Sequence, residues 1–210
     1  MDYATDEERV EELKKWWKEN GTSVLVGVAL GLSILFGWRW WTNYQETQSI
    51  SASALYSQLE SAVKAKKPDQ IKAFSSELFG QYESQIYASY AAITLAKSSM
   101  DANKPLQAVV HLRWALAHAN TDELKGLATA RLARALFAAG KSDEALKLAS
   151  VATSKPYQAM LQEIRGDILL GMGKRKEALD AYKNTQSSLS AGVQASPTLQ
   201  LKIDDLVSVE

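Results

Sequence analysis

The longest apolar run of the chain lies near its N-terminus. From Gly21 to Trp38 there are 18 residues without a charged side chain, and the aromatic residues up to Trp41 extend the run to about 20 residues. A helix needs about 20 apolar residues to cross a hydrocarbon layer of ~30 Å. The pattern predicts a membrane-spanning helix. The competing interpretations are a buried helix of a soluble protein and a cleaved signal peptide.

The tryptophans argue against the buried helix. Five of the six tryptophans flank the run: Trp16, Trp17, Trp38, Trp40 and Trp41. Indole rings favour the headgroup layers of a membrane, whereas a soluble core has no reason to sort them to both ends of one segment. A signal peptide is disfavoured because the preceding residues are acidic and no small-residue cleavage site directly follows the run. We therefore expect an uncleaved anchor.

The basic residues near the run predict its orientation. Only Arg39 follows the run before Lys64, whereas four basic residues precede it: Arg9, Lys14, Lys15 and Lys18. Positive charge near a membrane helix stays on the cytoplasmic side. We expect a cytoplasmic N-terminus, a single-pass bacterial inner-membrane protein and a large domain in the periplasm.

The residues before the anchor are expected to form a short amphipathic helix over 5–19. Thr5 and Glu8 have the spacing of a capping box, and Asn20-Gly21 is typical of a helix end. Within the anchor, Ser23, Gly27 and Gly31 recur every fourth residue. Such a row permits close packing against the membrane helix of a partner or of a second copy, although glycine is also simply common in membrane helices.

After residue 45, apolar positions recur at helical spacing and a short motif repeats. Residues 140–146 (GKSDEAL) agree with residues 173–179 (GKRKEAL) at five of seven positions, at an offset of 33. Weaker copies are 103–109 (NKPLQAV) and 67–70 (KPDQ), each displaced by 37. A period near 34 indicates helical hairpins that stack into a solenoid.

Small residues separated by 12 strengthen this interpretation. The pairs are Ala96 with Ala108, Ala133 with Ala145, and Gly166 with Ala178. Such residues let the two helices of a hairpin cross closely, and residues 83–187 resemble the tetratricopeptide-repeat family in this respect. A degenerate hairpin is expected at about 48–80. A last helix from Pro197, with Leu199, Leu201, Ile203 and Leu206, is expected to cap the final repeat.

Composition and motifs favour a non-enzymatic protein. The net charge is zero, which gives no argument for nucleic acid, and the absence of cysteine excludes thiol chemistry and cysteine-ligated metals. His111 and His118 lie on one helix face but lack a third donor, so we expect no metal and no cofactor. No nucleophile or phosphate-binding motif occurs.

In the tetratricopeptide-repeat family, the first helix of each repeat lines the concave face of the stack. The corresponding positions of this chain therefore form a candidate groove for extended polypeptide or a partner helix. Several members are also expected to be core residues. The candidates are Tyr90, Ile93, Lys97, Met100, Leu127, Arg134, Phe137, Met160, Asp167 and Leu170.

The whole chain resembles the YfgM-like ancillary subunits of the bacterial Sec translocon. The resemblance is strongest in residues 19–41, in Glu19-Asn20-Gly21, Gly27-Val28, Leu30-Gly31 and Gly37-Trp38-Arg39. It implies association with SecYEG and with a membrane-anchored periplasmic chaperone of the prolyl-isomerase-like type. It also implies transfer of emerging, unfolded polypeptides to chaperones, and a cytosolic link to a response regulator of envelope stress.

Together these observations predict an all-α protein with one N-terminal transmembrane helix, tetratricopeptide-like hairpins and a C-terminal capping helix. The expected divisions are a cytoplasmic tail (1–20), a membrane helix (21–41) and a periplasmic repeat domain (42–210). The expected function is that of a non-catalytic SecYEG-associated binding module. The alternative is a self-assembling envelope scaffold that uses the same glycine row and has no translocon role.

Overall fold

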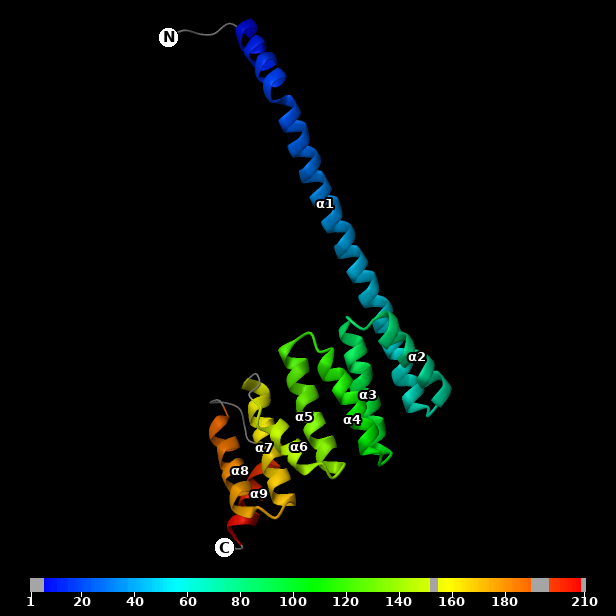
Figure 1. Cartoon of the computed structure of the whole chain (residues 1–210), viewed down its shortest axis with the longest axis vertical. Coiled ribbons are helices and arrows are strands. Elements are labelled where there is room, and N and C mark those ends of the chain that lie inside the picture. The colour runs from blue at the N-terminus through cyan, green and yellow to red at the C-terminus, as the bar shows by residue number, and fades with distance from the viewer. Residues whose placement is uncertain (1–5, 152–154, 190–196, 209–210) are drawn as a thin grey trace. The chain divides into compact units, whose positions relative to one another are not determined.

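The computed structural model describes residues 6–151, 155–189 and 197–208, and it contains no strand within them. Its helices are α1 (Asp6–Lys64), α2 (Pro68–Gln81), α3 (Ile86–Asp101), α4 (Pro105–Ala117), α5 (Asp122–Ala138), α6 (Ser142–Ala149), α7 (Lys155–Gly171), α8 (Arg175–Ser188) and α9 (Pro197–Val207) (Figure 1). The predicted all-α class is confirmed.

Helix α1 corrects one expectation, because it continues through Asn20-Gly21 instead of ending there. The Asn20 side-chain amide donates a hydrogen bond to the Trp16 carbonyl oxygen at 3.1 Å. A Cβ on Gly21 would lie 3.2 Å from the Trp17 ring, which covers this face of the helix. The helix continues because the apolar residues that follow need internal backbone hydrogen bonds in a membrane. Thr5, the expected cap, lies outside the described residues.

The chain divides into two compact units, Met1–Ser49 and Ile50–Glu210. In the first unit the apolar side chains of α1 contact almost nothing: Ile34, Phe36 and Trp38 are 71%, 68% and 70% exposed. A core helix of a soluble protein would be mostly buried, whereas only 6% of the most apolar 18-residue stretch of α1 is buried. By length and composition this helix could cross a membrane.

The second unit is built from helical hairpins whose turns are alike. One residue in each turn has a positive φ angle: Lys66 (52°), Asn103 (56°), Gly140 (75°) and Gly173 (78°). A lysine follows in every turn, and its N–H donates to the carbonyl five residues earlier, as in a Schellman helix end. These turns lie 37, 37 and 33 residues apart, so the structure confirms the repeat down to its faintest copy at 67–70.

Close helix crossings depend on the predicted small residues. Helices α3 and α4, α5 and α6, and α7 and α8 pair as successive hairpins (Figure 1). Ala96, Ala108, Ala133, Ala145 and Ala178 are all at most 2% exposed, so no larger side chain fits between the paired helices. In the degenerate first hairpin, Leu59 of α1 and Leu78 of α2 are fully buried in a core shared with α3.

Helix α9 packs on α8 and covers the last hairpin, as predicted. Leu199, Ile203 and Leu206 are buried in one cluster with the fully buried Tyr182. Leu201 corrects the expected apolar face, because it is 63% exposed. A residue two positions from Leu199 and Ile203 lies on the opposite side of a helix, so only the i, i+4, i+7 set can face α8.

Candidate functional site

The candidate groove residues lie on α3, α5 and α7, the first helices of the hairpins, but they differ in exposure. Tyr90, Lys97 and Arg134 are exposed. Ile93 is only 5% exposed and belongs to the core, which removes it as a contact residue. The remaining candidates are half-buried: Met100, Leu127, Phe137, Met160, Asp167 and Leu170.

Most of the half-buried candidates hold the repeats together. Met100, Leu127, Phe137 and Met160 pack against the main apolar core. Leu170 packs against the cluster under α9. The structure therefore places these side chains chiefly between helices, with part of each side chain exposed.

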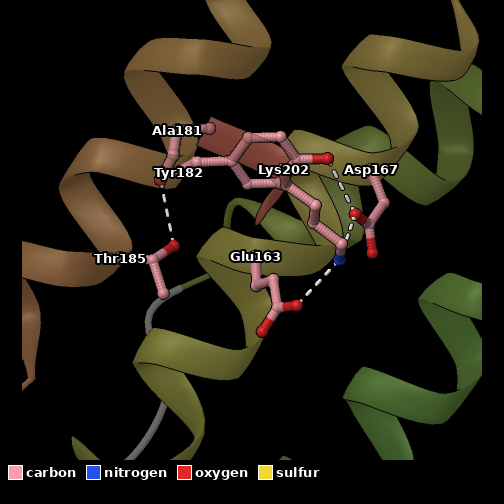
Figure 2. A network of polar contacts seen from close by, with 6 residues as sticks. All are labelled: Glu163, Asp167, Ala181, Tyr182, Thr185 and Lys202. Carbon is pink, nitrogen blue, oxygen red and sulfur yellow. Dashed lines mark hydrogen bonds and ion pairs between the residues drawn. The ribbon is translucent and has the colours of Figure 1, made fainter. Parts of the chain in front are cut away.

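Asp167 is engaged in a polar network beside α9, shown in Figure 2. One carboxylate oxygen accepts hydrogen bonds from the Tyr182 hydroxyl at 2.8 Å and from the Lys202 ammonium at 2.6 Å. The same ammonium donates to Glu163 at 2.8 Å, so one cation faces two carboxylates (Figure 2). The spacing of the α7 residues could not reveal this network, because its cation arrives on a helix 35 residues later in the chain.

The network shifts two pKa values. Burial lowers the pKa of Lys202, but the hydrogen bonds to Asp167 and Glu163 outweigh burial, so this pKa lies above the ordinary lysine value. Burial, and after it the hydrogen bond to Asp167, raises the pKa of Tyr182. Tyr182 thus stays a donor and Lys202 stays a cation at neutral pH, as the geometry requires.

Three tyrosines meet on the first two hairpins. The rings of Tyr56, Tyr87 and Tyr90 lie 6.0 to 6.3 Å apart, centre to centre. The Tyr56 hydroxyl lies 3.1 Å from both the Glu60 carboxylate and the Thr94 hydroxyl, which ties α1 to α3. Sequence reasoning found only Tyr90. The i, i+3 spacing of Tyr87 and Tyr90 was the available signal for a second ring on that face.

An open pocket of about 940 Å³ lies next to this cluster, between the end of α1, α2 and α3. Val63 and Ile71 supply apolar walls, and Thr94 joins the pocket to the tyrosines. Four lysines line it, of which only Lys97 was a candidate from the sequence: Lys64, Lys66, Lys97 and Lys104. The other three lie in or beside turns, where lysine usually signals nothing more than a solvated surface.

The two histidines have different surroundings. The His118 ring stacks on Trp114, with 4.0 Å between the ring centres, and its Nδ1 lies 2.9 Å from the Trp114 carbonyl oxygen. His111 is half-buried, and burial lowers its pKa. In the described ranges no three histidine, aspartate or glutamate side chains gather as metal ligands would.

An apolar helix followed by a stack of capped helical hairpins defines a tetratricopeptide-like protein, with one candidate membrane anchor among the residues that the structure describes. The family model of the tetratricopeptide repeat-like domain matches residues 14–208. The chain is 32% identical to the ancillary SecYEG translocon subunit of Escherichia coli K12, over 97% of this chain and 98% of that protein. The chain belongs to the family of ancillary SecYEG translocon subunits, as its resemblance predicted.

Two further relatives carry the same name. The Haemophilus influenzae protein is 31% identical over 90% of this chain and 92% of its own length. The Neisseria gonorrhoeae protein is 26% identical over 97% of this chain and 98% of its own length. The likeness thus includes both the apolar helix and the repeats.

Proposed function

We propose that this protein is an ancillary subunit of the SecYEG translocon in the bacterial inner membrane. The observation that carries the proposal is the similarity over nearly the whole length to relatives named for that role. The protein acts as a non-catalytic adaptor, which agrees with a repeat fold whose candidate side chains serve packing and surface contacts. A stack of hairpins offers a long surface for polypeptide, and this surface would hand emerging chains to periplasmic chaperones.

The proposed topology has a cytoplasmic N-terminus and a periplasmic repeat domain, based on the excess of basic residues before the anchor. Because the chain contains no cysteine, a single introduced cysteine reports its own location. Gln107→Cys on the exposed face of α4 should react with a membrane-impermeant maleimide in intact cells. Glu11→Cys should react only after the cells are opened. The reverse pattern would overturn the orientation.

The glycine row is the proposed docking surface within the membrane. Ser23, Gly27 and Gly31 are exposed, and a Cβ at either glycine would meet no atom of this chain. Close approach of a second helix is the situation in which these glycines would matter. Substituting Gly27 and Gly31 by leucine should reduce co-purification with SecYEG severalfold, while membrane insertion is unchanged.

Photocrosslinking in living cells gives the direct test, with a probe in place of Gly27. Adducts with channel subunits or with a membrane-anchored chaperone support the proposed function. Adducts with a second copy alone would instead favour a self-assembling scaffold. The matched control is a probe at Val28, the neighbouring position turned about 100° around the helix, which should give fewer adducts.

The cytosolic segment supplies the proposed regulatory role. Residues 8–19 form an exposed part of α1 that presents both acidic and basic side chains. A response regulator of envelope stress would bind here. Pull-down with the full chain, compared with a variant that lacks residues 1–15, would test this contact separately from the translocon.

A further inference from the structure

The pocket between α1, α2 and α3 carries more positive than negative charge. Lys64, Lys66 and Lys104 form no ion pair within the described part of the chain, whereas Lys97 pairs with Asp101 at 3.0 Å. The other acid in the wall, Glu60, accepts a hydrogen bond from the Tyr56 hydroxyl. The pocket is therefore suited to carboxylates supplied by a ligand.

One of these lysines occupies an unfavourable backbone conformation. Lys66 has a φ of 52°, at a turn position where the third and fourth turns have Gly140 and Gly173 and the second has Asn103. A side chain with a Cβ costs about 1 kcal/mol or more in this region, and glycine avoids this cost. The turn alone therefore does not account for a lysine at this point. The side chain of this lysine lines the pocket.

The pocket also has an apolar side, which continues into the tyrosine cluster. Val63 and Ile71 form walls of the pocket. Glu60 and Thr94 line it as well, and both lie 3.1 Å from the Tyr56 hydroxyl, so pocket and cluster adjoin. Tyr90 keeps 36% of its surface exposed, which leaves part of its ring for a ligand.

We propose that this pocket binds an acidic segment of extended polypeptide. Carboxylates of the segment pair with Lys64, Lys66 and Lys104, while apolar and aromatic side chains contact Val63, Ile71 and the tyrosines. A concave site with an apolar wall fits a chain of alternating acidic and apolar residues better than the flat headgroup layer of anionic lipid. The proposal names the partner chemistry of the repeat surface and rests on the proposed function.

The test uses the purified full chain in neutral lipid nanodiscs and a short fluorescent peptide that alternates Glu with Leu and Phe. Its matched control has Lys in place of each Glu. Anisotropy should show tighter binding of the acidic peptide, and the preference should fall with added salt. The double substitution Lys64→Glu and Lys104→Glu should weaken acidic-peptide binding about tenfold or more. Equal affinity for both peptides would overturn the proposal.

Two controls separate the pocket from general charge and from folding. Lys147→Glu with Lys176→Glu makes the same charge change at exposed positions of α6 and α8, and it should leave binding nearly unchanged. Lys66→Gly relieves the unfavourable φ angle, so it should unfold at an equal or higher temperature while acidic-peptide binding falls. Unchanged binding in Lys66→Gly and in the double substitution would contradict the proposal.

Nanodiscs that contain anionic lipid test whether the pocket binds lipid headgroups instead of an acidic polypeptide. If the acidic peptide fails to bind in neutral nanodiscs, while Lys64→Glu with Lys104→Glu abolishes an association of the repeat domain with anionic nanodiscs, the pocket binds a membrane surface and the proposal is wrong. Peptide binding needs no translocon, so its failure leaves crosslinking at Gly27 to SecYEG as an independent result. Conversely, if Gly27 forms no crosslinks with SecYEG but the acidic peptide still binds, the proposed function is rejected and the peptide-binding pocket is not.

Discussion

Gly166→Val should lower the free energy of unfolding of the last repeat by about 3 kcal/mol, near the upper end for overpacked cores. A Cβ at Gly166 would overlap the ring of Tyr182 on α8. This ring cannot move aside, because it is fully buried and its hydroxyl donates a hydrogen bond to Asp167. Urea unfolding of the purified chain, with hydrogen exchange to locate the change, would measure the effect.

The expected loss is local. A repeat contacts only its neighbours, so hydrogen exchange should speed up in α7, α8 and α9 and stay slow in α3. Gly80→Ala is the matched control. A Cβ at Gly80 meets nothing within 4 Å, so this exposed helix position should gain about 0.5–1 kcal/mol from the better helix former. Equal stability of Gly166→Val and the parent protein would show that α7 and α8 can separate at little cost.

Lys202→Glu should release α9 from the last repeat. The substitution removes the cation shared by Glu163 and Asp167 and places a third carboxylate beside them. We expect a loss of about 2–3 kcal/mol, below the ~3–5 kcal/mol of a fully buried pair, because the side chains of Lys202 and Asp167 are 28% and 34% exposed. Faster hydrogen exchange in α9, together with a lower unfolding temperature, would report the release.

Reversing both charges provides the control for Lys202→Glu. In the combined variant Glu163→Lys with Lys202→Glu, the new pair occupies the same two positions, whose side chains lie 2.8 Å apart in the parent protein. Part of the lost stability should return, because the interaction depends on opposite charge and not on a particular side chain. Lys183→Glu, on the exposed side of α8, should change stability by less than about 0.5 kcal/mol. No recovery in the combined variant would assign the loss to Lys202 packing over the Tyr182 ring.

The predicted helix end at Asn20-Gly21 shows a limit of local signals. Asparagine followed by glycine is typical of a helix end, yet α1 continues because Trp17 covers Gly21 and the apolar run begins there. The prediction that Leu201 belongs to the apolar face of α9 was wrong for a similar reason. The apolar residues between 199 and 206 do not by themselves show which of them face α8. In both cases the decisive contact comes from a residue outside the motif.

The repeat could be predicted from the sequence because every hairpin has the same local requirements. A turn needs a residue that tolerates positive φ, and a close crossing needs two small residues, so these requirements recur at fixed spacing in the sequence. Register alone could not sort the groove candidates, because the concave register contains both surface and core positions. Ile93 and Lys97 are four residues apart on one helix, yet one is buried and the other exposed.

The sequence by itself determined the apolar helix, the all-α class, the hairpin period and the family, because each depends on residues that are near in the chain or repeat along it. Only the tertiary structure determined which charged and aromatic side chains lie together on one surface. It brought Lys202 to Glu163 and Asp167, and it placed Lys64, Lys66, Lys97 and Lys104 around one pocket beside three tyrosines. These groups come from helices and turns that are far apart in the chain, and only the stacking of helices sets the distances between them.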